Sequence, residues 1–300
     1  MVELIHTFLN LAAPPFTFFS LLFFLPPFQI FKFFLSILGT LFSEDIAGKV
    51  VLITGASSGI GELLLLALLP PSEYMCYTLS STISQSSWDT DNSLAYEYAK
   101  RGACLVLAAR RERSLQDVAE RARNLGSPDV VVVHADVSKV DDCRRVVDQT
   151  MNHFGRLDHL VNNAGIMSLA MLEEVDNVTD FRQVMDINFW GSVYMTRFAA
   201  PYLRNSRGRI VVLSSPAAWM PAPRMSFYNA SKAAISQFFE TLRVEFGPDI
   251  GITLVTPGYI ESELSQGKFL NKAGKHIVDQ EMTAVSSPST QPLAHNQIIS

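Results

Sequence analysis

The fold is constrained most by one strand–turn–helix segment, Lys49–Glu62, whose sequence is K-V-V-L-I-T-G-A-S-S-G-I-G-E. Its apolar run 50–53 predicts a buried parallel strand, and a helix is expected to begin near Ile60. Glycine allows positive φ and close approach of the backbone to a ligand, while a helix N-terminus favours a diphosphate. The alternative is an ordinary tight turn. Its place between a strand and a helix favours nucleotide binding, with contacts from Gly55, Ser57, Ser58, Gly59, Ile60 and Gly61.

The rest of the chain alternates strands and helices, which predicts an α/β fold: a Rossmann-like, doubly wound parallel sheet in a three-layer αβα arrangement. Right-handed crossovers are expected to bring a ligand to the carboxyl ends of the strands, where the glycine-rich turn lies. Further strands are expected at 103–109, 130–134, 157–161, 209–213 and 252–255, and helices at 94–101, 114–124, 140–154, 179–203 and 226–246.

The first 43 residues form a strongly apolar segment. Residues 4–43 contain a single charge, Lys32, and 11 of the 20 phenylalanines of the chain. A transmembrane helix needs about 20 apolar residues, but Pro14-Pro15 and Pro26-Pro27 interrupt this segment. We therefore expect a hydrophobic membrane or lipid-droplet anchor at 1–43, as a hairpin with a proline knob, with a single span as the alternative. A folded domain is expected at 44–282 and a disordered polar tail at 283–300.

The composition of the chain argues against nucleic-acid binding and a metal site, and it indicates the redox compartment. The chain has 300 residues, enough for one large α/β domain, and its net charge of −5 offers no basic footprint for nucleic acid. Its three cysteines, Cys76, Cys104 and Cys143, provide neither a disulfide framework nor the spacing of a metal site. A reducing compartment and no metal are therefore expected.

Polar residues end three successive predicted strands. Arg110 and Arg111 stand where sites for NAD usually place an acid. A planar guanidinium suits a 2′-phosphate, so the pair predicts NADP(H), with a solvated basic pair as the alternative. Asp136 is expected either to meet the adenine edge or to cap the next helix. The third strand ends in N-N-A-G at 162–165, which offers three further cofactor contacts or only ties loops together: Asn163, Ala164 and Gly165.

The sharpest chemical signal is Y-N-A-S-K, in which Tyr228 and Lys232 lie four residues apart and so share one face of a helix. A free phenol has a pKa near 10, and a nearby ammonium lowers that pKa by favouring the phenolate. A decrease of about 3 would make Tyr228 a usable acid and base at neutral pH. Ser215 follows the preceding strand and is placed to hold a carbonyl or alcohol oxygen. A solvated helix pair is the alternative.

Taken together, these motifs resemble the short-chain dehydrogenase/reductase family from Lys49 to about Lys268. The matching segments are T-G-A-S-S-G-I-G, N-N-A-G, V-V-L-S-S, Y-N-A-S-K and T-P-G-Y-I-E-S. The resemblance implies that Tyr228 exchanges a proton with the substrate and that Ser215 orients the substrate oxygen. Lys232 would bind the nicotinamide ribose and tune Tyr228.

The resemblance implies further site residues. Asn188 would complete a catalytic tetrad by holding a water of the proton relay, with packing inside its helix as the alternative. The nicotinamide side of the cofactor would be contacted by Pro257, Gly258, Ile260 and Ser262.

The proline-bracketed apolar segment resembles one branch of the family, the steroleosins, which are hydroxysteroid dehydrogenase-like proteins of plant seed oil bodies. This implies an NADP(H)-dependent oxidoreductase that interconverts a hydroxyl and a keto group on a sterol or steroid. It also implies a place on a lipid droplet or the endoplasmic reticulum membrane, with the catalytic domain facing the cytosol, and it leaves a homodimer open. An apolar substrate pocket, or alternatively the core, would receive Trp219, Met220, Pro221 and Met225.

Two stretches depart from the family pattern. Residues 63–93 interrupt a helix that the family continues without a break, and 72–93 are expected to be a serine-rich loop. No edge strand is expected after 252–255, which would leave that strand's edge exposed. Three hypotheses follow: an active lipid-anchored sterol oxidoreductase, a catalytically impaired protein of the same fold at a lipid surface, or a reductase for another lipid such as a fatty carbonyl.

Overall fold

The computed structural model describes residues 44–57, 77–78, 94–257 and 268–278; the predicted anchor and tail lie outside these ranges. The chain divides into two compact units. One comprises Met1–Asp45 with Leu68–Pro70, of which only Glu44 and Asp45 are described, and the other comprises Ile46–Ala67 with Pro71–Ser300. Every helix and strand named below belongs to the second unit. Within the described ranges, no helix combines the length and apolar character that crossing a membrane requires.

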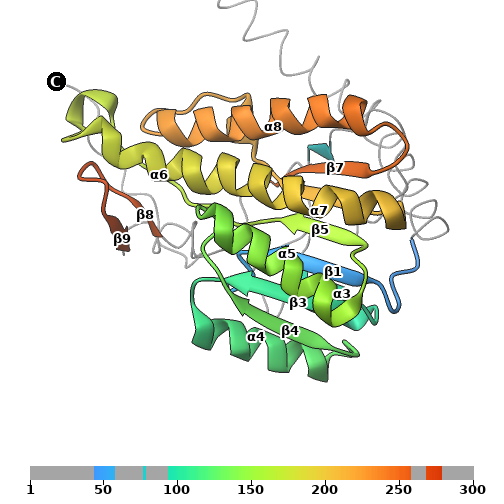
Figure 1. Cartoon of the computed structure of the whole chain (residues 1–300). Helices are drawn as coiled ribbons and strands as arrows, with labels where there is room; N and C mark the ends of the chain where they lie inside the picture. Colours follow the sequence, from blue (N-terminus) through green and yellow to red (C-terminus); the bar gives the residue numbers. More distant parts are fainter. Residues whose placement is uncertain (1–43, 58–76, 79–93, 258–267, 279–300) are drawn as a thin grey trace, which may run out of the picture. The chain divides into compact units, whose positions relative to one another are not determined.

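The second unit is built on a seven-stranded sheet in the order β2-β7-β6-β5-β1-β3-β4, with every pairing parallel (Figure 1). Apart from β2, which pairs with β7 at the opposite edge, the chain winds outward from β1 through β3 to β4 and then returns to β5 on the other side of β1. This reversal confirms the predicted Rossmann-like, doubly wound sheet. The strands are β1 (Val50–Thr54), β2 (Tyr77–Thr78), β3 (Cys104–Ala109), β4 (Val130–His134), β5 (His159–Asn162), β6 (Arg209–Leu213) and β7 (Gly251–Thr256).

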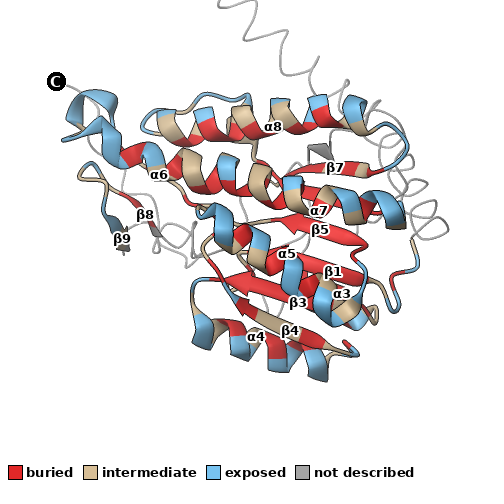
Figure 2. Ribbon diagram, viewed as in Figure 1, coloured by how far each residue is buried: buried red, intermediate tan, exposed pale blue. Residues whose placement is uncertain are grey.

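Helices cover the sheet in two groups. Helix α3 packs beside α4, α5 packs beside α7, and α8 packs against β7. Because parallel crossovers are right-handed, the reversal between β1 and β5 places α3 and α4 on the face opposite α5, α7 and α8. The strands are mostly buried, and α4, α5, α7 and α8 each expose one side (Figure 2). In α3 only Lys100 is exposed. The helices are α3 (Leu94–Lys100), α4 (Glu112–Asn124), α5 (Val140–Phe154), α7 (Ser192–Ser206) and α8 (Ser226–Phe246).

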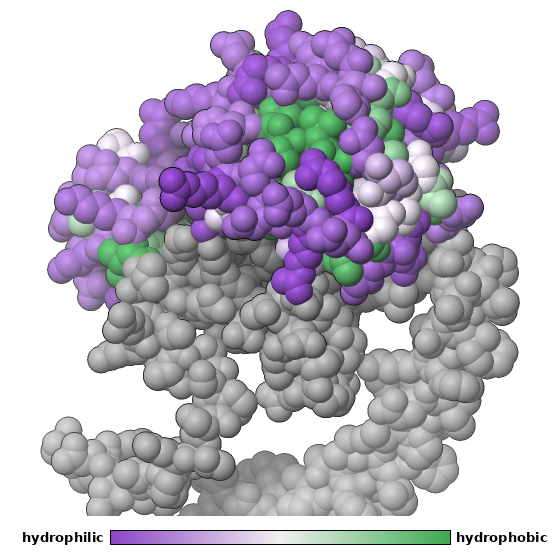
Figure 3. Space-filling view, turned by 90° about the horizontal axis from the view of Figure 1, so that it is seen from below, coloured by the Kyte–Doolittle hydropathy of each residue, from purple (hydrophilic) through white to green (hydrophobic). Residues whose placement is uncertain are grey.

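Strand β4 forms one edge of the sheet and consists of four valines and His134. Guanidinium groups from the flanking helices satisfy outward carbonyls at its two ends: Arg123 Nη2 donates to Val130 O at 2.7 Å, and Arg145 Nη2 donates to His134 O at 2.9 Å. Figure 3 views the side on which β4 and α4 lie, and its surface is mostly hydrophilic around a compact hydrophobic area. Arginines that occupy edge carbonyls reduce the chance that another strand pairs there.

The helix predicted at 179–203 is confirmed as an unbroken helical run, but its hydrogen-bonding type changes along its length. It is divided into a 3₁₀ turn η2 (Val178–Phe181), helix α6 (Arg182–Met185), a π-helical segment η3 (Asp186–Gly191) and α7. Such π segments are rare and frequently occur at functional sites. This one contains Asn188, and its last residue, Gly191, packs so closely on Val137 that an added Cβ would lie 2.8 Å from Val137 Cγ2.

Two predictions are wrong, namely that 72–93 is only a loop and that the edge of β7 is exposed. The stretch 72–93 contains β2, which pairs Tyr77 with Val255 and Thr78 with Thr256, so the carboxyl end of β7 is not an open edge. After β7 the described chain contains an antiparallel hairpin, β8 (Lys268–Leu270) with β9 (His276–Val278), which lies outside the main sheet and so does not contradict the expectation that no edge strand follows β7. These strands have two or three residues each, which is too short for a periodic hydrophobic pattern to reveal them.

Candidate active site

The turn after β1 lies against the segment that follows β5. Gly55 has φ +67°, and a Cβ added to it would lie 2.7 Å from Ala164 Cα. Only glycine fits such a conformation and such a contact together. The structure therefore brings the predicted cofactor residues Gly55 and Ala164 side by side, while Ser58, Gly59, Ile60 and Gly61 lie outside the described residues.

Thr54 joins these two segments, a role that the sequence analysis missed. Its Oγ1 accepts hydrogen bonds from the backbone N–H groups of Asn163 at 3.1 Å and Ala164 at 3.2 Å, and it donates to Val161 O. Asn163 Nδ2 donates to the carbonyls of Thr54 and Gly55, so this amide does tie loops together. Asn163 Oδ1 is buried and has no partner within the described residues. A buried acceptor beside a glycine turn fits a ligand that brings a donor.

Of the two strand-end arginines, Arg111 reaches the glycine-rich turn. Its Nη2 donates to Ser57 O at 3.2 Å and to Ser57 Oγ at 3.3 Å. Arg110 is exposed. The guanidinium of Arg111 thus lies beside the turn predicted to hold a diphosphate.

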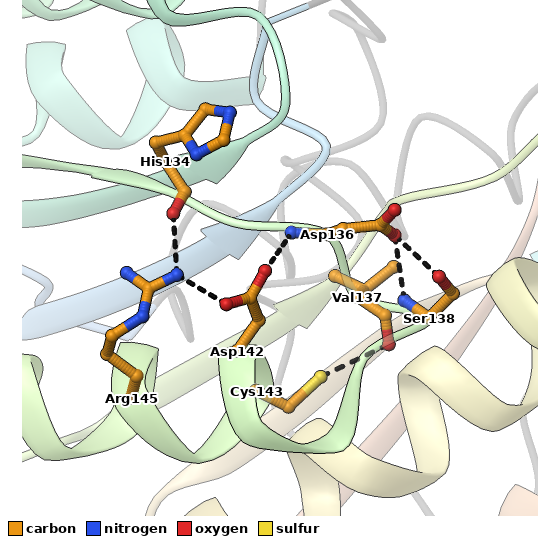
Figure 4. Close-up of polar contacts among 7 residues, drawn as sticks. All are labelled: His134, Asp136, Val137, Ser138, Asp142, Cys143 and Arg145. Atoms are coloured by element: carbon orange, nitrogen blue, oxygen red, sulfur yellow. Dashed lines mark hydrogen bonds and ion pairs between the residues drawn. The ribbon is translucent and has the colours of Figure 1, made fainter.

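The carboxylate of Asp136 closes a turn after β4 (Figure 4). Its Oδ1 accepts from Ser138 N at 3.0 Å and from Ser138 Oγ at 2.8 Å. The prediction that Asp136 caps α5 is wrong, because Lys139 occupies the N-cap position and makes no side-chain cap. Asp136 lies three residues before the N-cap, and its carboxylate accepts from the backbone N–H of Ser138, two residues along the chain, as in an Asx turn.

The four residues predicted as a catalytic tetrad come from three parts of the fold. Tyr228 and Lys232 lie on α8, Ser215 follows β6, and Asn188 lies in η3. Lys232 Nζ is 5.7 Å from the Tyr228 ring centroid. A Cβ added to Gly165 would lie 3.3 Å from Asn188 Oδ1 and 3.8 Å from Lys232 Nζ, so this glycine lies between two tetrad members.

The pKa of Tyr228 departs from its ordinary value in the direction opposite to our prediction. Burial raises the pKa of Tyr228, which is 8% exposed, and a hydrogen bond with Ser215 acts the other way. Lys232 does not lower the Tyr228 pKa here. Its ammonium donates to Leu213 O at 2.7 Å, and burial lowers the pKa of Lys232 itself to about 8. Desolvation of both groups therefore outweighs their attraction.

Asn188 is fully buried, and its side chain is occupied by protein partners. Oδ1 accepts from Ile166 N at 2.8 Å, and Nδ2 donates to Ile166 O and to Ser231 Oγ, each at 2.9 Å. Ser231 Oγ in turn donates to Tyr228 O at 2.7 Å. The side chain of Asn188 therefore links the segment after β5 to the first turn of α8. The residues of this link, Ile166 and Ser231, were not predicted from sequence.

The residues predicted to line a substrate pocket do not belong to the core. Trp219 is 59% exposed and Met220 is 54% exposed, directly after Ser215 and the turn η4 (Pro216–Ala218). Pro221 is exposed and Met225 half-buried. Pro257 follows β7 and is half-buried, while the other predicted nicotinamide contacts, Gly258, Ile260 and Ser262, lie outside the described residues.

Comparison with known proteins agrees with this geometry. Residues 92–273 match the family described as short chain dehydrogenase. The chain is 75% identical over 289 residues to 11-beta-hydroxysteroid dehydrogenase A of Sesamum indicum, covering 96% of this chain and 74% of that protein. It is 60% identical over 284 residues to 11-beta-hydroxysteroid dehydrogenase 1A of Arabidopsis thaliana, covering 95% and 73%.

A solved structure shares the fold as well. The short chain dehydrogenase/reductase of Burkholderia phymatum in complex with NAD superposes with a TM-score of 0.60 at 27% identity, covering 74% of this chain and 69% of that one. The chain therefore belongs to the short-chain dehydrogenase/reductase family of oxidoreductases. Within that family it is similar to plant proteins named 11-beta-hydroxysteroid dehydrogenase.

Proposed function

We propose that this chain is an NADP(H)-dependent hydroxysteroid dehydrogenase, anchored on a lipid surface, that interconverts a hydroxyl and a keto group on a sterol or steroid. The observation that carries the proposal is the arrangement at the carboxyl end of β6, where Lys232 bonds to Leu213 O and Ser215 bonds to Tyr228. The segment 164–165 lies between Lys232 and the glycine-rich turn. The names of the plant relatives support the substrate class.

Tyr228 and Ser215 act together on the substrate oxygen in the proposed mechanism. The Ser215 hydroxyl, which lowers the pKa of the buried phenol, orients the carbonyl or alcohol oxygen. Tyr228 donates its proton to that oxygen during reduction and accepts a proton from the alcohol during oxidation. The nicotinamide, when bound, supplies or accepts the hydride. Lys232, whose pKa burial lowers to about 8, is mostly protonated at neutral pH and would bind the nicotinamide ribose.

The preference for NADP(H) rests on Arg111. Its guanidinium lies against Ser57 in the glycine-rich turn, and no acid stands at the end of β3 to receive a ribose 2′-hydroxyl. The buried Asn163 Oδ1 without a partner and the close approach of Gly55 to Ala164 fit a nucleotide at this edge of the sheet. Both features lie where parallel α/β sheets bind their ligands.

The lipid anchor and the cellular place are part of the same proposal. Residues 4–43 hold one charge and 11 phenylalanines, and burial of each phenylalanine contributes about 1.5–3 kcal/mol. We expect a lipid-droplet or endoplasmic reticulum surface, with the catalytic domain in the cytosol. The exposed Trp219 and Met220 follow the catalytic serine and offer apolar surface to a sterol.

A turnover assay tests the enzymatic part. The full chain, purified with phospholipid or detergent, is supplied with an 11β-hydroxysteroid and NADP⁺, or with the 11-ketosteroid and NADPH. We expect cofactor-dependent conversion that falls by about 10²–10⁴ in Tyr228→Phe. NADPH binding without conversion of any steroid or fatty carbonyl would favour the impaired lipid-surface protein. A fatty carbonyl compound is tested with NADPH in the same assay, and conversion of this compound but of no steroid would favour the lipid reductase.

A flotation assay tests the anchor separately. The full chain is mixed with triacylglycerol droplets coated with phospholipid and then centrifuged. We expect the protein in the floating layer, including after washing with high salt, since apolar burial is not screened by ions. Recovery from the aqueous layer would contradict the anchor and leave the enzymatic proposal unaffected.

A further inference from the structure

Two side chains of α5, Asp142 and Arg145, form hydrogen bonds with the backbone of the turn that contains Asp136 (Figure 4). The last ladder bond of β4 runs from Ala135 N to Ala109 O, so Asp136 N is the first amide beyond the sheet. This amide donates to Asp142 Oδ2 at 2.9 Å. The orientation of Asp136 therefore depends on a carboxylate six residues further along the chain.

Asp142 is itself fixed by Arg145. Arg145 Nη2 donates to Asp142 Oδ1 at 2.6 Å and to His134 O at 2.9 Å. The pair thus binds the carbonyl of His134 and the amide of Asp136. Through these two bonds α5 fixes the backbone on both sides of Ala135. The side chains of Arg145 and Asp142 are 42% and 29% exposed, so water screens their attraction and the contribution of the pair is mainly geometric.

This use of Asp142 differs from ordinary helix capping. An acid at the third position of a helix commonly reaches back to the N-cap N–H. Lys139 is the N-cap of α5, but its N–H donates to Asp136 O. The Asp142 carboxylate instead accepts from Asp136 N, three residues before the N-cap. Both backbone groups of Asp136 are therefore engaged, while its carboxylate uses Oδ1 on Ser138. Within the described residues, no contact engages Asp136 Oδ2.

We propose that Asp142, supported by Arg145, is a positioning residue for nucleotide binding: through the Asp136 amide it aims the free carboxylate oxygen of Asp136 at the exocyclic amino group of adenine. The inference rests on the proposed function, since it requires a dinucleotide at the carboxyl ends of β1, β3 and β4. It assigns to α5, none of whose residues is itself a predicted cofactor contact, a role in recognising the adenine.

The test compares Asp142→Asn with Asp141→Asn in the full chain. Both changes remove one negative charge from the first turn of α5, but Asp141 is exposed and makes no described bond to the turn. Titration with 2′,5′-ADP measures the adenine end, and titration with nicotinamide mononucleotide measures the other end. We expect Asp142→Asn to weaken 2′,5′-ADP about tenfold, leave the mononucleotide unchanged, and raise the KM for NADPH without lowering kcat.

A second ligand measures the contribution of the exocyclic amino group of adenine to binding. In the hypoxanthine analogue of NADPH, oxygen replaces that group, so the wild-type protein is expected to bind the analogue more weakly than NADPH. The difference between the two ligands should shrink in Asp142→Asn and persist in Asp141→Asn. Arg145→Leu should act in the same direction with a smaller effect, since Asp142 still accepts from Asp136 N.

Amide hydrogen exchange gives a readout that needs no cofactor. The Asp136 amide should exchange faster in Asp142→Asn than in Asp141→Asn. Equal losses of 2′,5′-ADP affinity in the two variants, or equal affinity of the wild-type protein for NADPH and its hypoxanthine analogue, would overturn the positioning role while cofactor binding stands. Failure of the wild-type protein to bind any dinucleotide would instead overturn the proposed function, and this inference with it.

Discussion

Lys232 Nζ donates a hydrogen bond to the backbone carbonyl of Leu213 at 2.7 Å, which joins α8 to the last residue of β6. The ammonium is thereby held at the carboxyl end of the sheet although it is only 6% exposed. A buried ammonium with one protein acceptor is incompletely solvated, and burial lowers its pKa to about 8.

This lowered pKa predicts how stability changes with pH. An unfolded lysine has a pKa of about 10.4. Between pH 8 and that value the unfolded chain binds more protons at Lys232 than the folded chain, so this residue makes the free energy of unfolding rise with pH. Below pH 8 both states are protonated and the full cost of burying the charge, about 3 kcal/mol, is present.

Lys232→Met should remove that dependence. The stability difference between the variant and the wild-type protein should be largest at pH 7 and should shrink by pH 10, as measured by urea unfolding at several pH values. Lys272→Met, which changes an exposed lysine, is the control and should give a curve parallel to the wild type. A constant difference between Lys232→Met and the wild type would contradict the lowered pKa.

Alanine substitutions at Gly55 and Gly155 can distinguish the cost of a positive φ from the cost of a steric clash. Both have positive φ, +67° and +70°, but a Cβ at Gly155 meets nothing within 4 Å, whereas at Gly55 it meets Ala164 Cα at 2.7 Å. Gly155→Ala should cost about 1–2 kcal/mol of stability from the left-handed conformation alone. Gly55→Ala should cost about 3 kcal/mol or more and should also weaken nucleotide binding. Equal losses in urea unfolding would show that the Ala164 contact relaxes without cost.

The Asn188 link should matter more to stability than its serine partner. Asn188→Ala leaves both backbone groups of Ile166 without their buried partners, which should cost about 2–4 kcal/mol. Ser231→Ala removes one acceptor of Asn188 and one donor to Tyr228 O and should cost about 1–2 kcal/mol. Urea unfolding of both variants and of the double variant measures the coupling, and strict additivity would argue against a shared network.

Sequence patterns predict the sheet and the Tyr228–Lys232 pair because both depend on local signals, whereas Asn188 is implied only by the family resemblance. Strands such as Val130–His134 are apolar runs between helices, and Tyr228 and Lys232 share a helix face by spacing alone. The strands β2, β8 and β9 are too short to show a period. Asn188, in the π segment, bonds to Ile166 and Ser231, and only the folded chain brings these residues together.

The pKa of Tyr228 was wrongly predicted for the same reason. Spacing places Lys232 near the phenol, but it gives no measure of burial or of the competing acceptor Leu213 O. Likewise, the sequence places Asp136 at the end of β4 without revealing that Asp142 holds its amide. Interactions between residues distant in sequence therefore decide the electrostatics of the site, while local pattern decides its location.

Arg111 should determine the choice between the two nicotinamide cofactors. Arg111→Ala removes the guanidinium that contacts Ser57 in the glycine-rich turn, so a 2′-phosphate would lose a charge-assisted contact that NADH never makes. We expect the dissociation constant of NADPH to rise about 10- to 100-fold and that of NADH to change little, as measured by fluorescence titration. Arg113→Ala is the matched control, because Arg113 is an exposed arginine in the first turn of α4. It removes the same charge two residues away and should leave both affinities nearly unchanged. An equal loss for NADPH and NADH in Arg111→Ala would assign this arginine to the diphosphate rather than to the 2′-phosphate.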